Sequence, residues 1–345
     1  MHVPDGFLDL PTSIATGAVA AGAVSLGLQR AEREIKEAGA PLAGLTAAFV
    51  FAVQMVNFPV GAGTSGHLLG GTLAAVLVGP WTAVLCLTVV LVVQGLLFAD
   101  GGLTALGTNI TLIGVVTVLV GYLVAKALVG VLPRRPGSVV PAAVVGAFVS
   151  VPAAALVFVG LYVVGGAVPI DLGALTAAMV GWHTLIGVGE ALITGAVVGA
   201  VVATRPDLVF VTRHLRPDLV IAGADGETSV VRPDALAVRR TTGRPLAVGL
   251  AVSLVVAGVV SLFASANPDG LEFVGERLGF GAAATDSATA GGPLADYGVS
   301  FVDGSWLSAG LAGVLGVLVT VVLGAGLARL ARRNGDARTP ETTRV

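Results

Sequence analysis

The sequence is poor in charge and in the residues that usually build redox or disulfide-bonded sites. Only 12% of its 345 residues are charged, against roughly a quarter in an ordinary soluble domain. Its single cysteine, Cys86, lies in the apolar run WTAVLCLTVVLVV, which excludes an intramolecular disulfide and a cage of several cysteines around a metal. With 55% hydrophobic residues and a mean hydropathy of +0.94, the chain is predicted to be an integral membrane protein.

Lysine is nearly absent, and Lys36 and Lys126 are the only two. Neither stands in a Walker A motif, so the chain does not bind ATP through a P-loop, and an ATPase that drove transport would be a different protein. No Arg or Lys precedes the first apolar stretch, within residues 1–29, whereas a secretory signal begins with a basic region. We therefore expect the mature protein to keep its start.

Nine apolar stretches are predicted to be transmembrane helices, each of which needs about 20 mostly apolar residues to cross a bilayer. Seven lie near residues 11–29, 41–56, 67–79, 80–98, 106–127, 139–165 and 174–203, and two more lie near 245–266 and 306–328. The stretch at 67–79 is too short to cross alone. The sequence thus predicts an all-α polytopic membrane protein, with a seven-helix bundle and two additional helices.

The positive-inside rule predicts that the N-terminus lies outside, because eighteen of the nineteen Lys and Arg residues then face the cytoplasm. The polar linker at 205–244 and the tail at 331–345 are then cytoplasmic. The external segments collect ten acidic residues against one base, Arg277. Either this negative face concentrates cations, or acids simply fill the loops that the rule leaves to them.

The first residues could form a metal chelator. The α-amine of Met1, the backbone nitrogen of His2 and the Nδ1 atom of His2 can close two chelate rings on one metal. A second imidazole would complete a plane of four nitrogens, which suits Ni(II) or Cu(II) and can be imposed on Co(II). His67 is the nearest candidate. A histidine at position 2 is more often accidental, but the turn residues of VPDGF indicate a shaped segment rather than a frayed end.

His67 follows the glycine-rich stretch GAGTSG, and irregular backbone at membrane depth is tolerated only where protein or a cavity covers it. Short or broken membrane helices often mark the binding sites of transporters. Asn57, Thr64 and Ser65 could hydrogen-bond the imidazoles and orient them. They could equally make ordinary contacts between helices, as we expect for Gln54, Gln94, Thr108 and Asn109.

His183 and Glu190 lie seven residues apart and so share a face of the predicted helix at 174–203. Ionisable residues within a membrane segment are usually functional. They either support the metal ligands or pair with each other or with another helix.

An interpretation from another class treats the chain as an intramembrane serine protease. The stretch GTSG fits the G-x-S-G pattern in which rhomboid-type proteases present a serine, so Ser65 would be the nucleophile and His183 its base. Such a pattern is weak evidence in a chain with 49 glycines. It also gives no role to His2 or to His67.

Four stretches closely resemble the CbiM/NikM family, the substrate-binding membrane subunits of energy-coupling-factor transporters for cobalt and nickel. They are MHVPDGFLD, FAVQMVNFPVGAGTSGHLLGGTLAAVLVGPW, LVVQGLLFADGGLTALGTNI and HTLIGVGEALIT, within residues 1–204. The resemblance implies a seven-helix subunit whose N-terminus enters the bundle. It also implies that the Met1 amine, the His2 backbone and ring nitrogens and the His67 ring hold the metal.

Residues 245–330 resemble the small accessory subunit of CbiN/NikN type, through NPDGLEFVGERLGF and PLADYGV between two apolar stretches. The resemblance implies that its external loop, with a net charge of −5, delivers or gates the metal. It further implies a coupling protein of CbiQ/NikQ type and two ATPases of CbiO/NikO type as partners in the cell membrane, besides lipid and without nucleic acid.

We therefore expect a transporter subunit rather than an enzyme, which carries Co(II) or Ni(II) as substrate and holds no organic cofactor. Ligand nitrogens must lose protons before they bind a metal, and α-amines have a pKa of about 7.7 to 8.0. Metal affinity should therefore fall below neutral pH. The same ligands occur in relatives assigned to either metal, so the sequence does not decide between cobalt and nickel.

Overall fold

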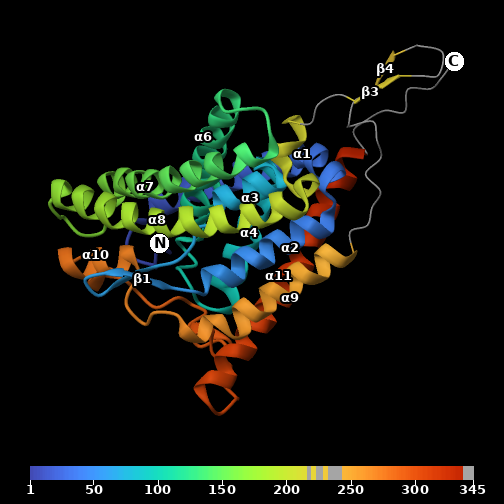
Figure 1. The fold of residues 1–345 in the computed structure, drawn as a ribbon. Helices are drawn as coiled ribbons and strands as arrows, with labels where there is room; N and C mark the ends of the chain where they lie inside the picture. Colours follow the sequence, from blue (N-terminus) through green and yellow to red (C-terminus); the bar gives the residue numbers. More distant parts are fainter. Residues whose placement is uncertain (216–218, 223–227, 232–242, 337–345) are drawn as a thin grey trace.

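The protein is mostly helical in the computed structural model, which describes residues 1–215, 219–222, 228–231 and 243–336 (Figure 1). The helices of the first part are α1 (Leu10–Ala38), α2 (Ala40–Gln54), α3 (Gly71–Val78), α4 (Pro80–Leu97), α5 (Leu106–Asn109), the π-helix η1 (Ile110–Val116), α6 (Thr117–Val131), α7 (Val139–Gly165) and α8 (Leu172–Thr204). The second part contains α9 (Gly243–Gly258), α10 (Gly270–Leu278) and α11 (Ser305–Asp336). Short 3₁₀ turns, η2 (Pro136–Ser138), η3 (Pro206–Leu208), η4 (Phe210–Leu215), η6 (Val260–Phe263), η7 (Gly281–Ala283) and η8 (Ala295–Tyr297), link them.

The prediction of an all-α polytopic membrane protein is confirmed, but the count of nine spans needs correction. Within the described residues, seven helices are long and apolar enough to cross a membrane. The other two predicted spans are the 15-residue α2 and the eight-residue α3. Helix α3 is short because glycines with positive φ, Gly70 and Gly79, stand at its two ends and Pro80 starts the next helix.

Two short antiparallel hairpins were not predicted. Strands β1 (Phe58–Gly61) and β2 (Thr64–Gly66) pair between α2 and α3, with a bulge between Pro59 and Gly61. Strands β3 (Leu219–Ala222) and β4 (Thr228–Val231) pair within the linker. The first hairpin leads directly to His67, so the irregular backbone expected before this histidine has a defined structure.

The chain starts as a buried segment rather than a frayed end. Met1, Val3 and Phe7 are each at most 2% exposed, and the first helix begins only at Leu10. Asp9 caps this helix, because its side chain accepts a hydrogen bond from the Thr12 backbone N–H. The N-terminus therefore lies inside the fold, between α8 and the region of β1 and α10 (Figure 1).

Helices α9 and α11 pack along α2, and α11 also contacts α1 and α4 (Figure 1). The backbones of α2 and α11 approach closely at small residues. A Cβ atom on Gly44 would lie 2.6 Å from the carbonyl oxygen of Val321 and 2.8 Å from the backbone nitrogen of Ala325. Close backbone approach at small residues is a common way for membrane helices to associate. This close approach of α2 and α11 attaches the C-terminal part of the chain to the N-terminal part.

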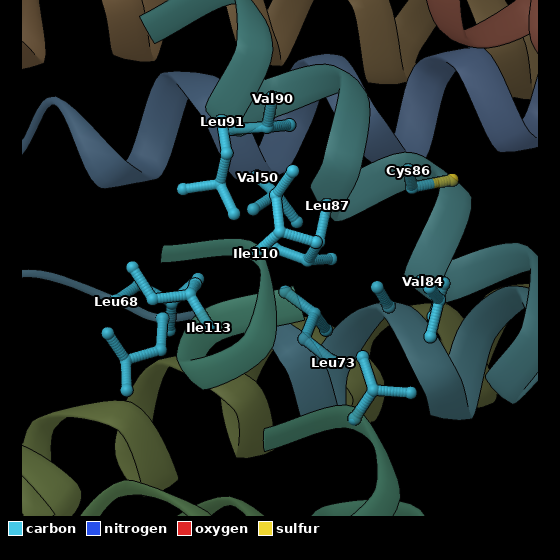
Figure 2. Close-up of a cluster of buried hydrophobic side chains, with 14 of the residues drawn as sticks. Val50, Leu68, Leu73, Val84, Cys86, Leu87, Val90, Leu91, Ile110 and Ile113 are labelled. Atoms are coloured by element: carbon cyan, nitrogen blue, oxygen red, sulfur yellow. The ribbon is translucent and has the colours of Figure 1, made fainter. Parts of the chain in front are cut away.

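Leu68, the residue after His67, belongs to a buried apolar cluster (Figure 2). It is fully buried, as are Leu73 of α3 and Ile113 of η1 in the same cluster. Cys86 of α4 is also buried and is a free thiol, as the sequence suggested. Dense packing of these buried side chains holds the backbone next to His67 in place.

Candidate metal centre

The N-terminal segment is held in place by side chains from the α4–α6 region. Asn109 accepts a hydrogen bond from the Val3 backbone N–H at 2.7 Å and donates one to the Val3 carbonyl at 3.0 Å. The Asp5 carboxylate accepts hydrogen bonds from the backbone N–H groups of residues 103–105. Gly102 permits this contact, because a Cβ atom there would lie 2.2 Å from Asp5 Oδ1. The amine of Met1 therefore has a fixed position.

The Met1 amine lies next to the His67 imidazole. Its nitrogen is 2.7 Å from His67 Nε2, although the two residues are 66 positions apart. Two nitrogens bound at right angles to one metal, at bond lengths of about 2.0 to 2.1 Å, would be separated by roughly 2.8 to 3.0 Å. The observed separation is close to this value. These two nitrogens therefore need little movement to share a metal.

The His67 ring has a defined orientation. Its Nδ1 atom is 2.9 Å from the Leu68 carbonyl oxygen, and because a carbonyl only accepts, Nδ1 carries the proton. The lone pair of Nε2 then faces the amine. A backbone carbonyl on the far nitrogen is a usual arrangement for histidines that bind metals.

Glu190 supports the loop that carries His67. Its two carboxylate oxygens accept hydrogen bonds from the backbone N–H groups of Leu69 at 2.5 Å and Gly70 at 2.9 Å. Gln54 donates to the carbonyl of Leu69 at 2.9 Å. Glu190 is fully buried, and both of its oxygens are satisfied by backbone that immediately follows His67. It fits the supporting position that the sequence suggested for it.

His2 lies beside His67, with the two rings nearly parallel at 18° and their centroids 4.9 Å apart. The Nε2 atom of His2 is 3.2 Å from Gln94 Oε1, and its Nδ1 atom is 3.2 Å from Asp100 Oδ1. Gln94 and Asn109, which we expected to join helices, instead hold the first three residues. Thr108 does join helices, since its hydroxyl is 2.8 Å from that of Thr16.

Two residues of the C-terminal part, Asp269 and Tyr297, lie next to these N-terminal residues or their partners. Asp269, at the start of α10, accepts a hydrogen bond from the Met1 amine at 2.6 Å, and the same oxygen is 3.8 Å from His67 Nε2. Tyr297 donates a hydrogen bond to Asp100 at 2.6 Å, and Asp100 contacts His2. We define the metal-centre cluster as Met1, His2, His67, Asp100 and Asp269.

Burial sets the charge states of the cluster. Burial and the nearby positive N-terminus lower the pKa of His67 well below its usual value, and burial lowers the pKa of His2 as well. Both imidazoles are therefore neutral near pH 7, the form that binds metals. Burial alone would raise the pKa of Asp269, but the Met1 ammonium outweighs it, so the pKa is lowered and Asp269 is a carboxylate.

Among the described residues, no three His, Cys, Asp or Glu side chains are arranged to hold a metal by themselves. The ligand set expected from the sequence contains two imidazoles, an amine and a backbone nitrogen. A site of this kind depends on main-chain atoms at the start of the chain. The structure brings Met1, His2 and His67 together, as that expectation requires.

Other predicted residues lie nearby without contacting the imidazoles. The Asn57 carbonyl accepts a hydrogen bond from the Ser265 backbone at 2.8 Å, and the Thr64 hydroxyl is buried without a hydrogen bond among the described residues. His183 is fully buried, and its Nδ1 atom is 2.8 Å from the Met179 carbonyl. Its Nε2 atom has no hydrogen-bond partner in the part of the chain that is described.

The protease alternative is not supported. The Ser65 hydroxyl donates to the carbonyl oxygens of Asn267 at 2.7 Å and Pro268 at 3.2 Å. A serine whose proton is held by carbonyls cannot pass it to His183, and no hydrogen bond joins these two residues in the described structure. Ser65 instead links the β1–β2 hairpin to the turn before α10.

Sequence reasoning missed Asp100, Asp269 and Tyr297 as neighbours of the predicted ligands. It assigned the two aspartates only to external segments, by charge counting. The sequence PDGLE does contain one usable signal, because Asp and Glu three residues apart predict a capping box. Asp269 and Glu272 form that box at the start of α10.

The chain matches two known protein families. Residues 2–208 match the CbiM family, described as the cobalt uptake substrate-specific transmembrane region, over more than half of the chain. The chain belongs to the CbiM family. Residues 243–333 match the PDGLE domain, so this CbiM protein carries both regions in one polypeptide. It is a multi-pass membrane protein of a family that transports cobalt and nickel.

Known relatives share this organisation. A putative fused nickel transport protein NikMN of Archaeoglobus fulgidus is 32% identical over 96% of this chain and 99% of its own. A fused nickel transport protein NikMN of Rhodobacter capsulatus is 31% identical over 97% of this chain and 100% of its own. A crystal structure of a truncated transition metal transporter is 30% identical, has a TM-score of 0.52 and covers 59% of this CbiM protein and 99% of that chain.

Proposed function

We propose that this chain is the substrate-binding subunit of an ATP-driven energy-coupling-factor importer for Co(II) or Ni(II). The observation that carries the proposal is the 2.7 Å separation between the Met1 amine and His67 Nε2, in a buried cluster that also contains His2. The names of the relatives support a divalent transition metal as the substrate.

The metal would be held by four nitrogens from the Met1 amine, the backbone and ring of His2, and the ring of His67. Nitrogen ligands suit Ni(II) and Co(II), and a planar set favours Ni(II) among these two. The orientation of His67 supports this role, because its far nitrogen is already bonded to the Leu68 carbonyl. His2 needs its Nδ1 atom to turn from Asp100 to the metal.

The organisation of the importer follows from the charge pattern and the family. Residues 1–204 would form the metal-binding domain, 205–244 a cytoplasmic linker, 245–330 the accessory domain and 331–345 a cytoplasmic tail, with the N-terminus outside. Because the chain lacks a P-loop lysine, ATP hydrolysis would be supplied by two ATPases, joined through a coupling protein. Copurification of an ATPase and a coupling protein with the tagged chain tests this assembly.

Metal binding to the purified full chain tests the site itself. We expect about one Co(II) or Ni(II) per chain in equilibrium dialysis when the N-terminus is native. Residues added before Met1 convert the amine into an amide, which is not an amine ligand, and should weaken binding by more than about 100-fold. His67→Ala should weaken it similarly.

The matched control carries the same added residues after Val345, far from the amine in sequence. It should bind metal like the unmodified chain. Equal affinity of the two extended chains would exclude the amine as a ligand. Competition between the two metals in the same dialysis measures the preference for cobalt or nickel.

A further inference from the structure

We propose that Asp269 of the PDGLE domain is a latch on the metal site. It holds the Met1 amine and must release it before metal binds. The proposal rests on the proposed function, since it concerns access to the same nitrogens. It assigns a regulatory role to a single carboxylate of the C-terminal region.

The first argument is competition for one nitrogen. The Met1 amine donates hydrogen bonds to Asp269 Oδ2 at 2.6 Å and to His67 Nε2 at 2.7 Å. A nitrogen that donates to both partners in this way has no lone pair directed at a metal, and the lone pair of His67 is occupied too. The contact seen here and metal coordination by the same atoms therefore exclude each other.

The second argument is that Asp269 is rigidly placed. Its other oxygen, Oδ1, accepts hydrogen bonds from the backbone N–H groups of Leu271 at 2.7 Å and Glu272 at 2.9 Å. The side chain of Glu272 in turn accepts a hydrogen bond from the Asp269 N–H at 3.0 Å. The carboxylate is thus fixed to the start of α10. It leaves the amine by movement of this helix and not by a simple side-chain rotation.

The third argument is that the start of α10 is fitted against the first domain. Next to Asp269, Gly270 packs on α8, where a Cβ atom would lie 2.7 Å from Ile186 Cδ1 and 3.3 Å from His183 Cε1. On the other side, Ser65 bonds to the carbonyls of Asn267 and Pro268 through its side chain, and to Pro268 also through its backbone. These contacts hold the turn at residues 267–270 against β2 and α8, next to the Met1 amine.

The packing of α10 limits how the latch opens. Helix α10 has nine residues, and its buried side packs against α8, β2 and η7. The turn before α10 is bonded to Ser65, two residues before His67. Release of the amine therefore requires local opening of this turn and of the start of α10, which also breaks the contacts of Ser65.

Chemical labelling of amines tests the latch without metal. The chain has three primary amines, those of Met1, Lys36 and Lys126, and mass spectrometry of peptides reads each separately. In the full chain at fixed pH, Met1 should react slowly. Asp269→Asn should speed its labelling by about tenfold or more, because a buried contact is lost, while both lysines label at unchanged rates.

Two further variants separate the latch from a simple change of charge. Ser65→Ala keeps the carboxylate but removes the side-chain hydrogen bonds that hold the turn before α10, so it should also speed Met1 labelling. Asp286→Asn removes a charge from an exposed position of the same loop and should change nothing. Unchanged labelling in both Asp269→Asn and Ser65→Ala would overturn the proposal.

Metal binding supplies the second readout. Because Asp269 stabilises a state that cannot bind, Asp269→Asn should bind Co(II) about tenfold more tightly than the unmodified chain. Weaker binding would show that the carboxylate acts in the metal-bound state, and would overturn the latch. If no form bound metal while labelling responded as expected, the contact would stand and the proposed substrate would fail. Normal binding with unresponsive labelling would overturn the latch and leave the proposed substrate intact.

Discussion

The two sides of the metal-centre cluster are built differently. On one side, the His67 loop is bonded through its backbone to Glu190 and Gln54 and rests on the apolar cluster around Leu68. On the other side, the PDGLE region touches the cluster through two side chains, Asp269 and Tyr297. The first side is held through its backbone groups, whereas the second contacts the cluster through side-chain oxygens.

The membrane spans of the two regions also differ in how much of their surface is buried inside the protein. In the most apolar stretch of α4, 67% of the residues are buried, whereas the figure for the span that contains α9 is 11%. Helix α4 carries Gln94, which contacts His2. The proposed ligand His2 therefore lies against a densely packed helix. In the proposed site, the CbiM region would supply a preformed half and the PDGLE region a movable cover.

Among the residues that only support the proposed ligands, the largest effect should come from breaking the preformed side at Glu190. Glu190→Ala leaves the N–H groups of Leu69 and Gly70 buried and unpaired, at a cost of about 1 to 3 kcal/mol each. The His67 loop would then shift, and metal affinity should fall by up to about 100-fold, the upper range for residues that support metal ligands. Isothermal titration of the purified chain measures this loss.

The matched control is Thr194→Val on the same helix. Thr194 is also fully buried, but its hydroxyl has no hydrogen bond among the described residues. It should leave the metal affinity unchanged. A loss as large as that of Glu190→Ala would mean that any buried polar change in α8 disturbs the site, and the specific role of Glu190 would be wrong.

Acidity should have the next largest effect, because a nitrogen ligand must lose its proton before it binds a metal. Burial lowers the pKa of His67 and of His2, so these imidazoles gain protons only below the ordinary histidine range. A decline in affinity that begins above that range would therefore report protons displaced from the main-chain nitrogens of Met1 and His2. Each proton displaced should lower the affinity by about tenfold for each unit by which the pH falls.

Titrations between pH 8.5 and 6 measure this dependence. The decline should begin above the ordinary histidine pKa of about 6.5. An affinity that stayed level down to that value and fell only below it would assign the dependence to an imidazole. The main-chain nitrogens of Met1 and His2 would then be excluded as ligands.

Sequence patterns predicted the helices and the chelating start, because both are local. Apolar stretches of about 20 residues and the Met1–His2 pair are read directly from neighbouring residues. The supporting contacts are not local. Gln94 and Asn109 were assigned to helix pairing because no local pattern shows that the N-terminal residues, which the resemblance places inside the bundle, contact these two side chains.

The same limit explains the contacts of the PDGLE region. Asp269 is 268 residues from Met1, and Tyr297 is 197 residues from Asp100. Hydropathy gives no information about such pairs, and the charge count placed these acids only on one side of the membrane. Ser65 was misread as a possible nucleophile for the same reason, since its carbonyl partners lie 202 and 203 residues away.

The smallest effect should come from loosening the movable side at Tyr297. Tyr297→Phe removes only the hydroxyl that donates to Asp100, while the ring keeps its stacking on Phe98 at 4.8 Å. Asp100 then turns more freely toward His2 or a metal, and one hydrogen bond to a charged group is lost, about 1.5 to 3 kcal/mol. Because this contact belongs to the cover rather than to the ligands, we expect a change of only a few-fold in equilibrium affinity but faster metal entry and release, measured by stopped-flow competition with a chelator. Phe98→Leu removes the ring contact and leaves the hydroxyl, although it also removes the contact of Phe98 with Phe51. An affinity loss as large as that of Glu190→Ala would remove the distinction between a preformed side and a cover.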